Sequence, residues 1–311
     1  MTVLVNLIVI LGMFYVVPVG LLLIDPVRLR AAARLWPLAA LPGALCLWLP
    51  RGAAATALAA LYACAALAPA AHAPARLLRT RSLAPAEVAA LTALVAPSVA
   101  GIALVAERAG YRLFGFDLDI LALTVPHFHF AGFTAALVAG LVCRSAGARR
   151  WARWAAYSVP AGTLLVLLGY FVDDWAELLG AIVLTAGMWA VALVTWRDLR
   201  PVAGDRTTGT LLAVSAAVLV ATMLLALWWA VGEATGIAHP TLTWMAATHG
   251  LGNALGFALC SLLAWRRLTA GPTAPAGPTD PTAPAAVPTA PAAVPAPTAP
   301  AMTPAPPAAT R

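Results

Sequence analysis

Two histidines stand one residue apart in the stretch TVPHFHFAGF, residues 124–133, which is otherwise almost wholly apolar. Pro126 suits the first turn of a helix, where its missing N–H costs nothing. In a regular helix His127 and His129 project about 200° apart, so they would not bind one metal ion together. The structural interpretation is that both histidines simply lie at the membrane interface. A polar ring inside an apolar segment is costly, however, so both are candidate proton-transfer groups.

Three carboxyls gather in YFVDDWAELLG, residues 170–180. Asp173 and Asp174 fall in a tight turn, and Glu177 follows on the same helical face. Asp174 and Glu177 resemble a helix capping box, which is the structural interpretation. The functional interpretation is that mutual repulsion and partial burial keep at least one carboxyl protonated, ready to act as an acid. The two interpretations are compatible, because a cap can hold a catalytic acid in place.

A third polar group lies in HPTLTWMAATHGLGNALGF, residues 239–257. His249 and Asn253 are four residues apart and therefore share one helical face, two to three turns into the apolar segment. Gly252 and Gly256 have the small-xxx-small spacing that lets another helix approach closely. They do not form a dinucleotide-binding fingerprint, since no strand precedes them. A deep histidine–asparagine pair predicts function more specifically than a histidine at a helix end.

Side chains near these groups are the candidate substrate contacts. Tryptophan faces can stabilise a cationic intermediate, although an interfacial aromatic belt explains most of the 11 tryptophans. The predicted contacts are Asn253, Glu233, Trp175, Trp228, Trp229 and Phe130.

The elements that must position these groups are membrane-spanning helices. The 311 residues are 62% hydrophobic and only 10% charged, whereas a soluble domain carries about a quarter charged residues. Apolar runs long enough to span a bilayer predict an all-α, polytopic transmembrane helical bundle of eight to nine spans over residues 1–267. The segment 35–49 is short and holds Pro37 and Pro42, so we expect it to be kinked or not to cross fully. The nine segments are 2–24, 35–49, 53–72, 87–106, 120–142, 154–172, 175–196, 209–231 and 241–264.

Charge predicts the orientation of this bundle. The net charge of +7 comes entirely from arginine, because the chain has no lysine. All but three of the 19 arginines, the exceptions being Arg51, Arg108 and Arg112, fall on one side of the predicted spans or in the tail. The positive-inside rule then places the N-terminus outside and the C-terminus in the cytoplasm, in a multi-pass protein of a bacterial cytoplasmic membrane. This explains the basic composition without a nucleic-acid partner. Most acids and histidines fall on the outer side.

Residues 268–311 are nearly all Ala, Pro, Thr, Gly and Val. Repeats such as PTAPA and PAAVPA cannot form a packed core, so they predict a disordered cytoplasmic tail. The four cysteines form no CxxC pair and are expected to be small apolar side chains.

The motifs HFHFAGF and THGLGNALGF resemble those of the YndJ-like bacterial integral membrane proteins, over roughly residues 90–265. The resemblance implies a polytopic helical bundle and points to His127, His129, His249 and Asn253 as functional positions. It implies no defined activity, and it does not choose between an enzyme and a transporter.

Two classes of function fit these residues. The first is a membrane enzyme with acid–base chemistry on a lipophilic substrate, most simply a cyclisation or isomerisation of the kind that integral membrane terpene cyclases perform. Its partners would be membrane lipids and that small molecule, with no cofactor or metal. The second is a small-molecule transporter with an intramembrane proton relay, against which stands the lack of a repeated half. The candidate catalytic residues are His127, His129, Asp173, Asp174, Glu177 and His249.

A metal-dependent enzyme is a third hypothesis. It would use the same three histidines with a carboxylate of Asp173 or Asp174, ligand types that suit zinc or iron. The spacing matches no recognised metal-binding signature.

Overall fold

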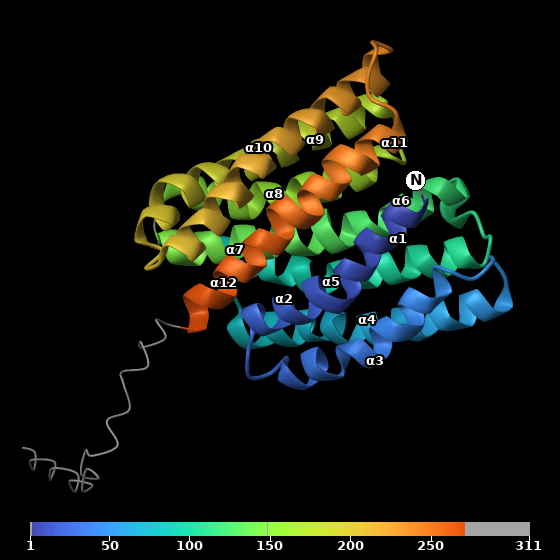
Figure 1. The fold of residues 1–311 in the computed structure, drawn as a ribbon, viewed down its shortest axis with the longest axis horizontal. Coiled ribbons are helices and arrows are strands. Elements are labelled where there is room, and N and C mark those ends of the chain that lie inside the picture. Colours follow the sequence, from blue (N-terminus) through green and yellow to red (C-terminus); the bar gives the residue numbers. More distant parts are fainter. Residues whose placement is uncertain (1, 148, 271–311) are drawn as a thin grey trace, which may run out of the picture. The chain divides into compact units, whose positions relative to one another are not determined.

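A computed structural model describes residues 2–147 and 149–270, and within these ranges the chain is helical with no strand (Figure 1). The first half contains α1 (Thr2–Leu11), η1 (Gly12–Val16), α2 (Val17–Ile24), α3 (Arg30–Cys46), α4 (Ala53–Thr80), α5 (Pro85–Arg108), η2 (Leu113–Gly115), α6 (Leu118–His127), η3 (Phe128–Thr134) and α7 (Ala135–Ala146). The second half contains α8 (Arg150–Gly169), α9 (Asp174–Val194), η4 (Thr195–Leu199), η5 (Arg200–Val202), α10 (Arg206–Thr235), α11 (Leu242–Met245), η6 (Ala246–Gly250), η7 (Gly252–Leu259) and α12 (Cys260–Ala270).

Several of these elements join end to end into longer helices. Seven helices in the described ranges are long and apolar enough to cross a membrane. The helix α3 is shorter than these, and α8 is less apolar. Each predicted segment corresponds to one of the nine helices, so the all-α membrane bundle is confirmed, while the orientation stays a prediction. The seven are Thr2–Ile24, Ala53–Thr80, Pro85–Arg108, Leu118–Ala146, Asp174–Val202, Arg206–Thr235 and Leu242–Ala270.

Most helices run further than their apolar segments. The segment predicted over 53–72, for example, continues as a helix to Thr80. Hydropathy detects only the part of a helix that suits hydrocarbon, whereas the backbone hydrogen bonds continue into the polar ends. The last helix likewise runs to Ala270, so residues 268–270 of the predicted tail are helical, and the rest of that tail lies outside the described residues.

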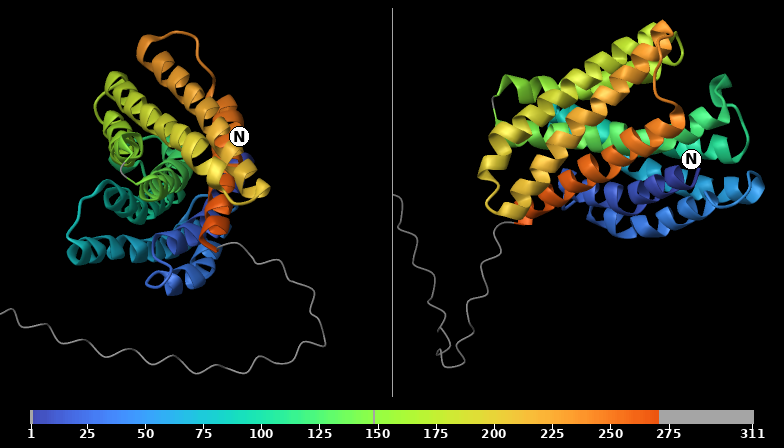
Figure 2. Two further views of the ribbon diagram at one scale, coloured as in Figure 1. Left: turned by 90° about the vertical axis from the view of Figure 1, so that its left-hand side faces the viewer. Right: turned by 45° about the horizontal axis from the view of Figure 1, so that its top comes forward.

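The two ends of the bundle differ in charge. Figures 1 and 2 show the loops gathered at two opposite ends. We call one the arginine end, which holds the turns before α3, α5, α8 and α10. We call the other the carboxylate end, which holds the turns before α4, α6, α9 and α11.

Glycines allow α8 and α9 to pack backbone against backbone. A Cβ atom on Gly162 would lie 2.5 Å from the backbone nitrogen of Leu184, and one on Gly169 would overlap the backbone of Glu177. Contacts that short are not sterically possible, so no larger residue fits there without moving a helix. The result is a tight antiparallel hairpin whose turn lies at the carboxylate end.

Wide π-helical turns interrupt three of the other helices. The segments η1, η3 and η7 contact one another in the bundle interior. In η3 the Thr134 hydroxyl donates to the carbonyl oxygen of His129, five residues earlier, at 2.9 Å. A π-helical turn re-aims the side chains that follow it and is frequent at functional sites.

Candidate functional site

A cavity of about 260 Å³ lies inside the bundle between α1, α6, η3, α8, α9, α10 and the last helix. Its walls are mostly aliphatic and aromatic, and we call it the inner cavity. Only a few polar side chains lie in these apolar walls, as is usual in sites for small molecules. These polar side chains are Thr124, His127, Thr163, Tyr170, Glu177, His249 and Asn253.

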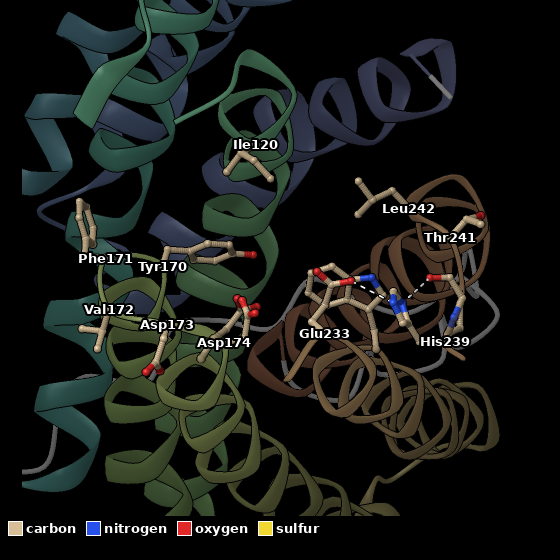
Figure 3. A pocket seen from close by; sticks show the side chains of 14 residues that line it. Ile120, Tyr170, Phe171, Val172, Asp173, Asp174, Glu233, His239, Thr241 and Leu242 are labelled. Atoms are coloured by element: carbon tan, nitrogen blue, oxygen red, sulfur yellow. Dashed lines mark hydrogen bonds and ion pairs between the residues drawn. The ribbon is translucent and has the colours of Figure 1, made fainter. Parts of the chain in front are cut away.

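A second cavity of about 350 Å³ lies at the carboxylate end, and we call it the vestibule (Figure 3). Figure 3 shows Tyr170 and Asp174 on one side of it and Glu233 with His239 on the other. Four carboxyls line it, from Asp173, Asp174, Glu177 and Glu233. The vestibule adjoins the inner cavity, because both are lined by Ile120, Tyr170, Glu177, Trp229 and Leu242.

His127 brings an imidazole to the wall of the inner cavity. Its Nδ1 lies 2.7 Å from the carbonyl oxygen of Leu123, one turn earlier. A carbonyl oxygen only accepts hydrogen bonds, so Nδ1 carries the hydrogen and a neutral ring has its lone pair on Nε2. Among the described residues that Nε2 atom has no hydrogen-bond partner. It is therefore free to accept a proton.

His249 is fixed by a closed ring of hydrogen bonds. Its Nδ1–H donates to the carbonyl oxygen of Thr222 at 2.8 Å, and its Nε2 accepts from the Asn253 carboxamide at 3.1 Å. The Thr222 hydroxyl donates in turn to Oδ1 of Asn253 at 2.8 Å. This ring fixes the tautomer of His249 and the orientation of Asn253, and both side chains line the inner cavity.

Glu177 stands between the two cavities. Glu177 is only 9% exposed, and its carboxyl makes no ion pair with any residue in the described ranges. The close approach of Gly169 places the first turn of α9 beside the end of α8, and so brings the Tyr170 phenol to the Glu177 carboxyl. Burial and that neighbouring carboxylate raise the pKa of the Tyr170 phenol. The phenol therefore stays protonated and can donate to the carboxyl.

His129 does not reach either cavity. It is 0% exposed, and its Nε2 lies 2.5 Å from the Tyr62 hydroxyl while its Nδ1 donates to the carbonyl oxygen of Val125 at 2.7 Å. Both ring nitrogens are thus satisfied in the core between η1, α4 and η3. His127 and His129 still project in opposite directions although η3 is π-helical. The ring of His127 therefore faces the inner cavity, and that of His129 faces the core.

The remaining predicted residues divide between the cavities and the surface. Phe130 lines the inner cavity, and Trp229 lines both cavities. Trp175 is 62% exposed and lines neither cavity. The exposed Trp228 indole donates to the carbonyl oxygen of Ala238 at 3.0 Å and also lies outside both. Adjacent tryptophans on one helix face different directions, which separates Trp228 from Trp229.

The helix cap falls one residue earlier than the sequence suggested. Asp173, not Asp174, is the N-cap of α9, and its Oδ1 accepts from the backbone N–H of Ala176 at 2.8 Å. Asp174 is therefore exposed at the vestibule without a capping role. Glu233 pairs there with Nε2 of His239 at 3.1 Å.

Two contributors escaped the sequence analysis. Thr222 is one of several threonines in an apolar helix, and nothing in its local sequence distinguishes it. Tyr170 directly precedes the acidic turn, and that position was the one signal available. No group of three or more His, Cys, Asp or Glu side chains in the described part of the chain is arranged to hold a metal ion.

Comparisons with known proteins give a consistent picture. The sequence model of a family described as "YndJ-like protein" matches residues 7–257. An "Uncharacterized membrane protein YndJ" of Bacillus subtilis (strain 168) is 27% identical over 183 residues, which is 58% of this chain and 33% of that protein. The match thus spans about a third of the relative's length. No solved structure matches.

Proposed function

The chain belongs to the YndJ-like family of multi-pass membrane proteins, and we propose that it is an enzyme that transfers protons to and from a lipophilic small molecule within the bilayer. The observation that carries this proposal is the inner cavity. One apolar chamber has both a buried carboxyl, Glu177, and an imidazole with a free ring nitrogen, His127, in its walls.

The simplest reaction for such a chamber is a double-bond isomerisation. Glu177, in its protonated form, donates a proton to one carbon of an alkene and becomes a carboxylate. The adjacent carbon becomes a cation, and Nε2 of His127 removes a proton from its neighbour, which forms the shifted double bond. Attack of a second double bond on the same cation would give a ring instead. Positioned acids and bases of this kind contribute about 10²–10⁴-fold in rate.

The walls suit a cationic intermediate. Phe128, Phe130 and Trp229 line the inner cavity, and aromatic faces attract positive charge. The ring of hydrogen bonds around His249 presents neutral polar groups in fixed positions, which can orient a substrate without adding a competing charge.

The vestibule supplies a path for the proton. After one turnover Glu177 lacks a proton and His127 has gained one, so the cycle closes when His127 releases its proton into the shared cavity and Glu177 takes up another. Glu177 also lines the vestibule with three further carboxyls, so it can regain a proton from the water-facing side. Because Glu177 lines both cavities, a second candidate is a transporter. In it Glu177 would carry protons while a solute moves between the two cavities.

Deuterium labelling in isolated membranes tests the proposal. Membranes that contain the protein are incubated in partly deuterated water with a lipophilic extract of unlabelled cells, and the products are compared by mass spectrometry with those from membranes that contain Glu177→Gln or His127→Gln. We expect an isomer that carries deuterium on carbon only when the unaltered protein is present. The matched control is Asp119→Asn, an exposed acid at the same end that lines neither cavity.

A transporter would give a different result. It would move a compound across the membrane without placing deuterium on carbon. If no Glu177-dependent labelled isomer forms although the protein is in the membrane, the enzyme proposal fails.

A further inference from the structure

Acids at the two ends of the bundle differ in their counter-charges. At the arginine end, each acid in the described part of the chain pairs with an arginine. The pairs are Asp25–Arg79 at 3.8 Å, Glu87–Arg76 at 2.7 Å, Asp198–Arg149 at 3.2 Å and Asp205–Arg267 at 3.2 Å.

The few arginines at the carboxylate end are already engaged elsewhere. Arg51 and Arg108 both bind Glu107, and Arg112 binds Asp117 at 2.6 Å. Neither cavity wall includes an arginine among the described residues. The vestibule carboxyls therefore face one another with a single basic neighbour, His239, which pairs with Glu233.

Glu177 distinguishes this excess of carboxyls from an ordinary solvent-exposed acidic surface. It is about nine-tenths buried, lines both the vestibule and the inner cavity, and has no cationic partner in the described ranges. A buried carboxyl without a counter-charge is costly. A positively charged ligand in the vestibule would stabilise the carboxylate that Glu177 becomes after it donates its proton.

The lining favours an organic cation over a metal ion. The described His, Cys, Asp and Glu side chains form no group that could hold a metal ion. Instead Tyr170, Phe171 and Trp229 line the vestibule beside the carboxyls, and aromatic faces with carboxylates are the usual surroundings of bound ammonium groups. The apolar inner cavity lies directly behind them.

We propose that the vestibule and the inner cavity together bind an amphiphilic organic cation. Its ammonium group lies between Asp174 and Glu233, and its hydrocarbon part passes Tyr170 and Trp229 into the inner cavity, toward His127. This assigns a substrate class to the enzyme proposed above and rests on that proposal. It places the reacting carbons beside Glu177 and the charge in the vestibule.

Equilibrium binding to the full chain in lipid nanodiscs tests the inference, with empty nanodiscs as the background. The probes are decyltrimethylammonium and decyl sulfate below their micellar concentrations, and decanol below its solubility limit. We expect the cation to bind at least about tenfold more tightly than either of the others, and added salt to weaken its binding. Asp174→Asn combined with Glu233→Gln should weaken cation binding by about tenfold or more, a shift equivalent to at least about 1.4 kcal/mol.

The matched control is again Asp119→Asn, which should bind all three probes as the unaltered protein does. An unchanged thermal unfolding midpoint for the double variant would show that the bundle is intact. The inference is overturned if decanol binds as tightly as the cation, or if a folded double variant retains full cation affinity.

Failure of this inference and failure of the proposed enzyme give different results. Labelled isomers without selective cation binding would remove the substrate class and leave the enzyme. Selective cation binding without labelled isomers would remove the enzyme and leave the cation site.

Discussion

The Tyr62 hydroxyl and the His129 imidazole, 67 residues apart in the sequence, meet at 2.5 Å in the core of the bundle. Both side chains are fully buried. Because Nδ1 of His129 donates to a backbone carbonyl, Nε2 must accept, and the phenol is its donor. This hydrogen bond ties α4 to the π-helical turn that follows His127.

Removing that phenol should cost stability and spare the chemistry. Tyr62→Phe leaves Nε2 of His129 buried without a donor, which typically lowers the free energy of unfolding by about 1–3 kcal/mol. Denaturant unfolding of the purified protein in detergent would measure the loss. Tyr157→Phe is the matched control, since Tyr157 is 45% exposed and its hydroxyl bonds one backbone carbonyl. Equal stability of the two variants would show that the buried pair contributes nothing.

The ring around His249 predicts a graded effect on turnover. Thr222→Val removes the hydroxyl that holds Asn253, so Asn253 no longer fixes the imidazole. We expect turnover to fall by about tenfold, equivalent to about 1.4 kcal/mol, because in the proposed reaction His249 would orient the substrate and would not itself transfer the proton. Thr222→Ser keeps the hydroxyl and should restore turnover. Thr210→Val, an exposed threonine on the same helix, serves as the control. No recovery in the serine variant would mean that the methyl group, not the hydroxyl, matters.

Helix approach at Gly256 can be tested by compensation. A Cβ atom there would lie 2.6 Å from Cγ1 of Val218, so Gly256→Ala should push the last helix away from α10 and lower the unfolding temperature. Val218→Ala in the same chain removes the obstructing methyl groups and should recover much of the loss. Gly250→Ala is the control, because its nearest neighbour would be 3.6 Å away. Purely additive effects of the two substitutions would contradict this close contact.

The arginine distribution predicts the orientation of the bundle in the membrane. A reporter that is active only in the cytoplasm, fused after residue 267, should be active, and one inserted in the turn before α6 should be silent. The opposite pattern would place the vestibule on the cytoplasmic side and reverse the direction from which protons reach Glu177.

Helices were predictable because each needs only a local signal. Nine apolar segments gave nine helices, including α3 with Pro37 and Pro42 inside it. The contacts of individual side chains were harder to predict from the sequence. The spacing of His127 and His129 showed that they face apart, but not which one faces a cavity, since Tyr62 comes from a distant helix.

Aromatic and acidic positions show the same limit. Trp228 and Trp229 are equivalent by composition, yet one is exposed and the other lines both cavities. Asp173 and Asp174 differ only in which carboxyl meets the N–H of Ala176. Such distinctions depend on helix rotation and on the last residue of a turn, which hydrophobic periodicity fixes only to within a residue or two.

The glycine contacts between α8 and α9 also fix one wall of the vestibule. Gly162 and Gly169 leave no space between the two backbones, so the hairpin behaves as a rigid post that carries Tyr170 and Glu177. The opposite side of the vestibule is also closely packed, because a Cβ atom on Gly232 would overlap His239, and the Trp228 indole donates to the carbonyl oxygen of Ala238 in the loop between α10 and α11. Both walls of the vestibule therefore depend on a glycine, Gly169 beside Glu177 on one side and Gly232 beside His239 on the other, so a larger residue at either position should reshape the vestibule without changing any of its carboxyls.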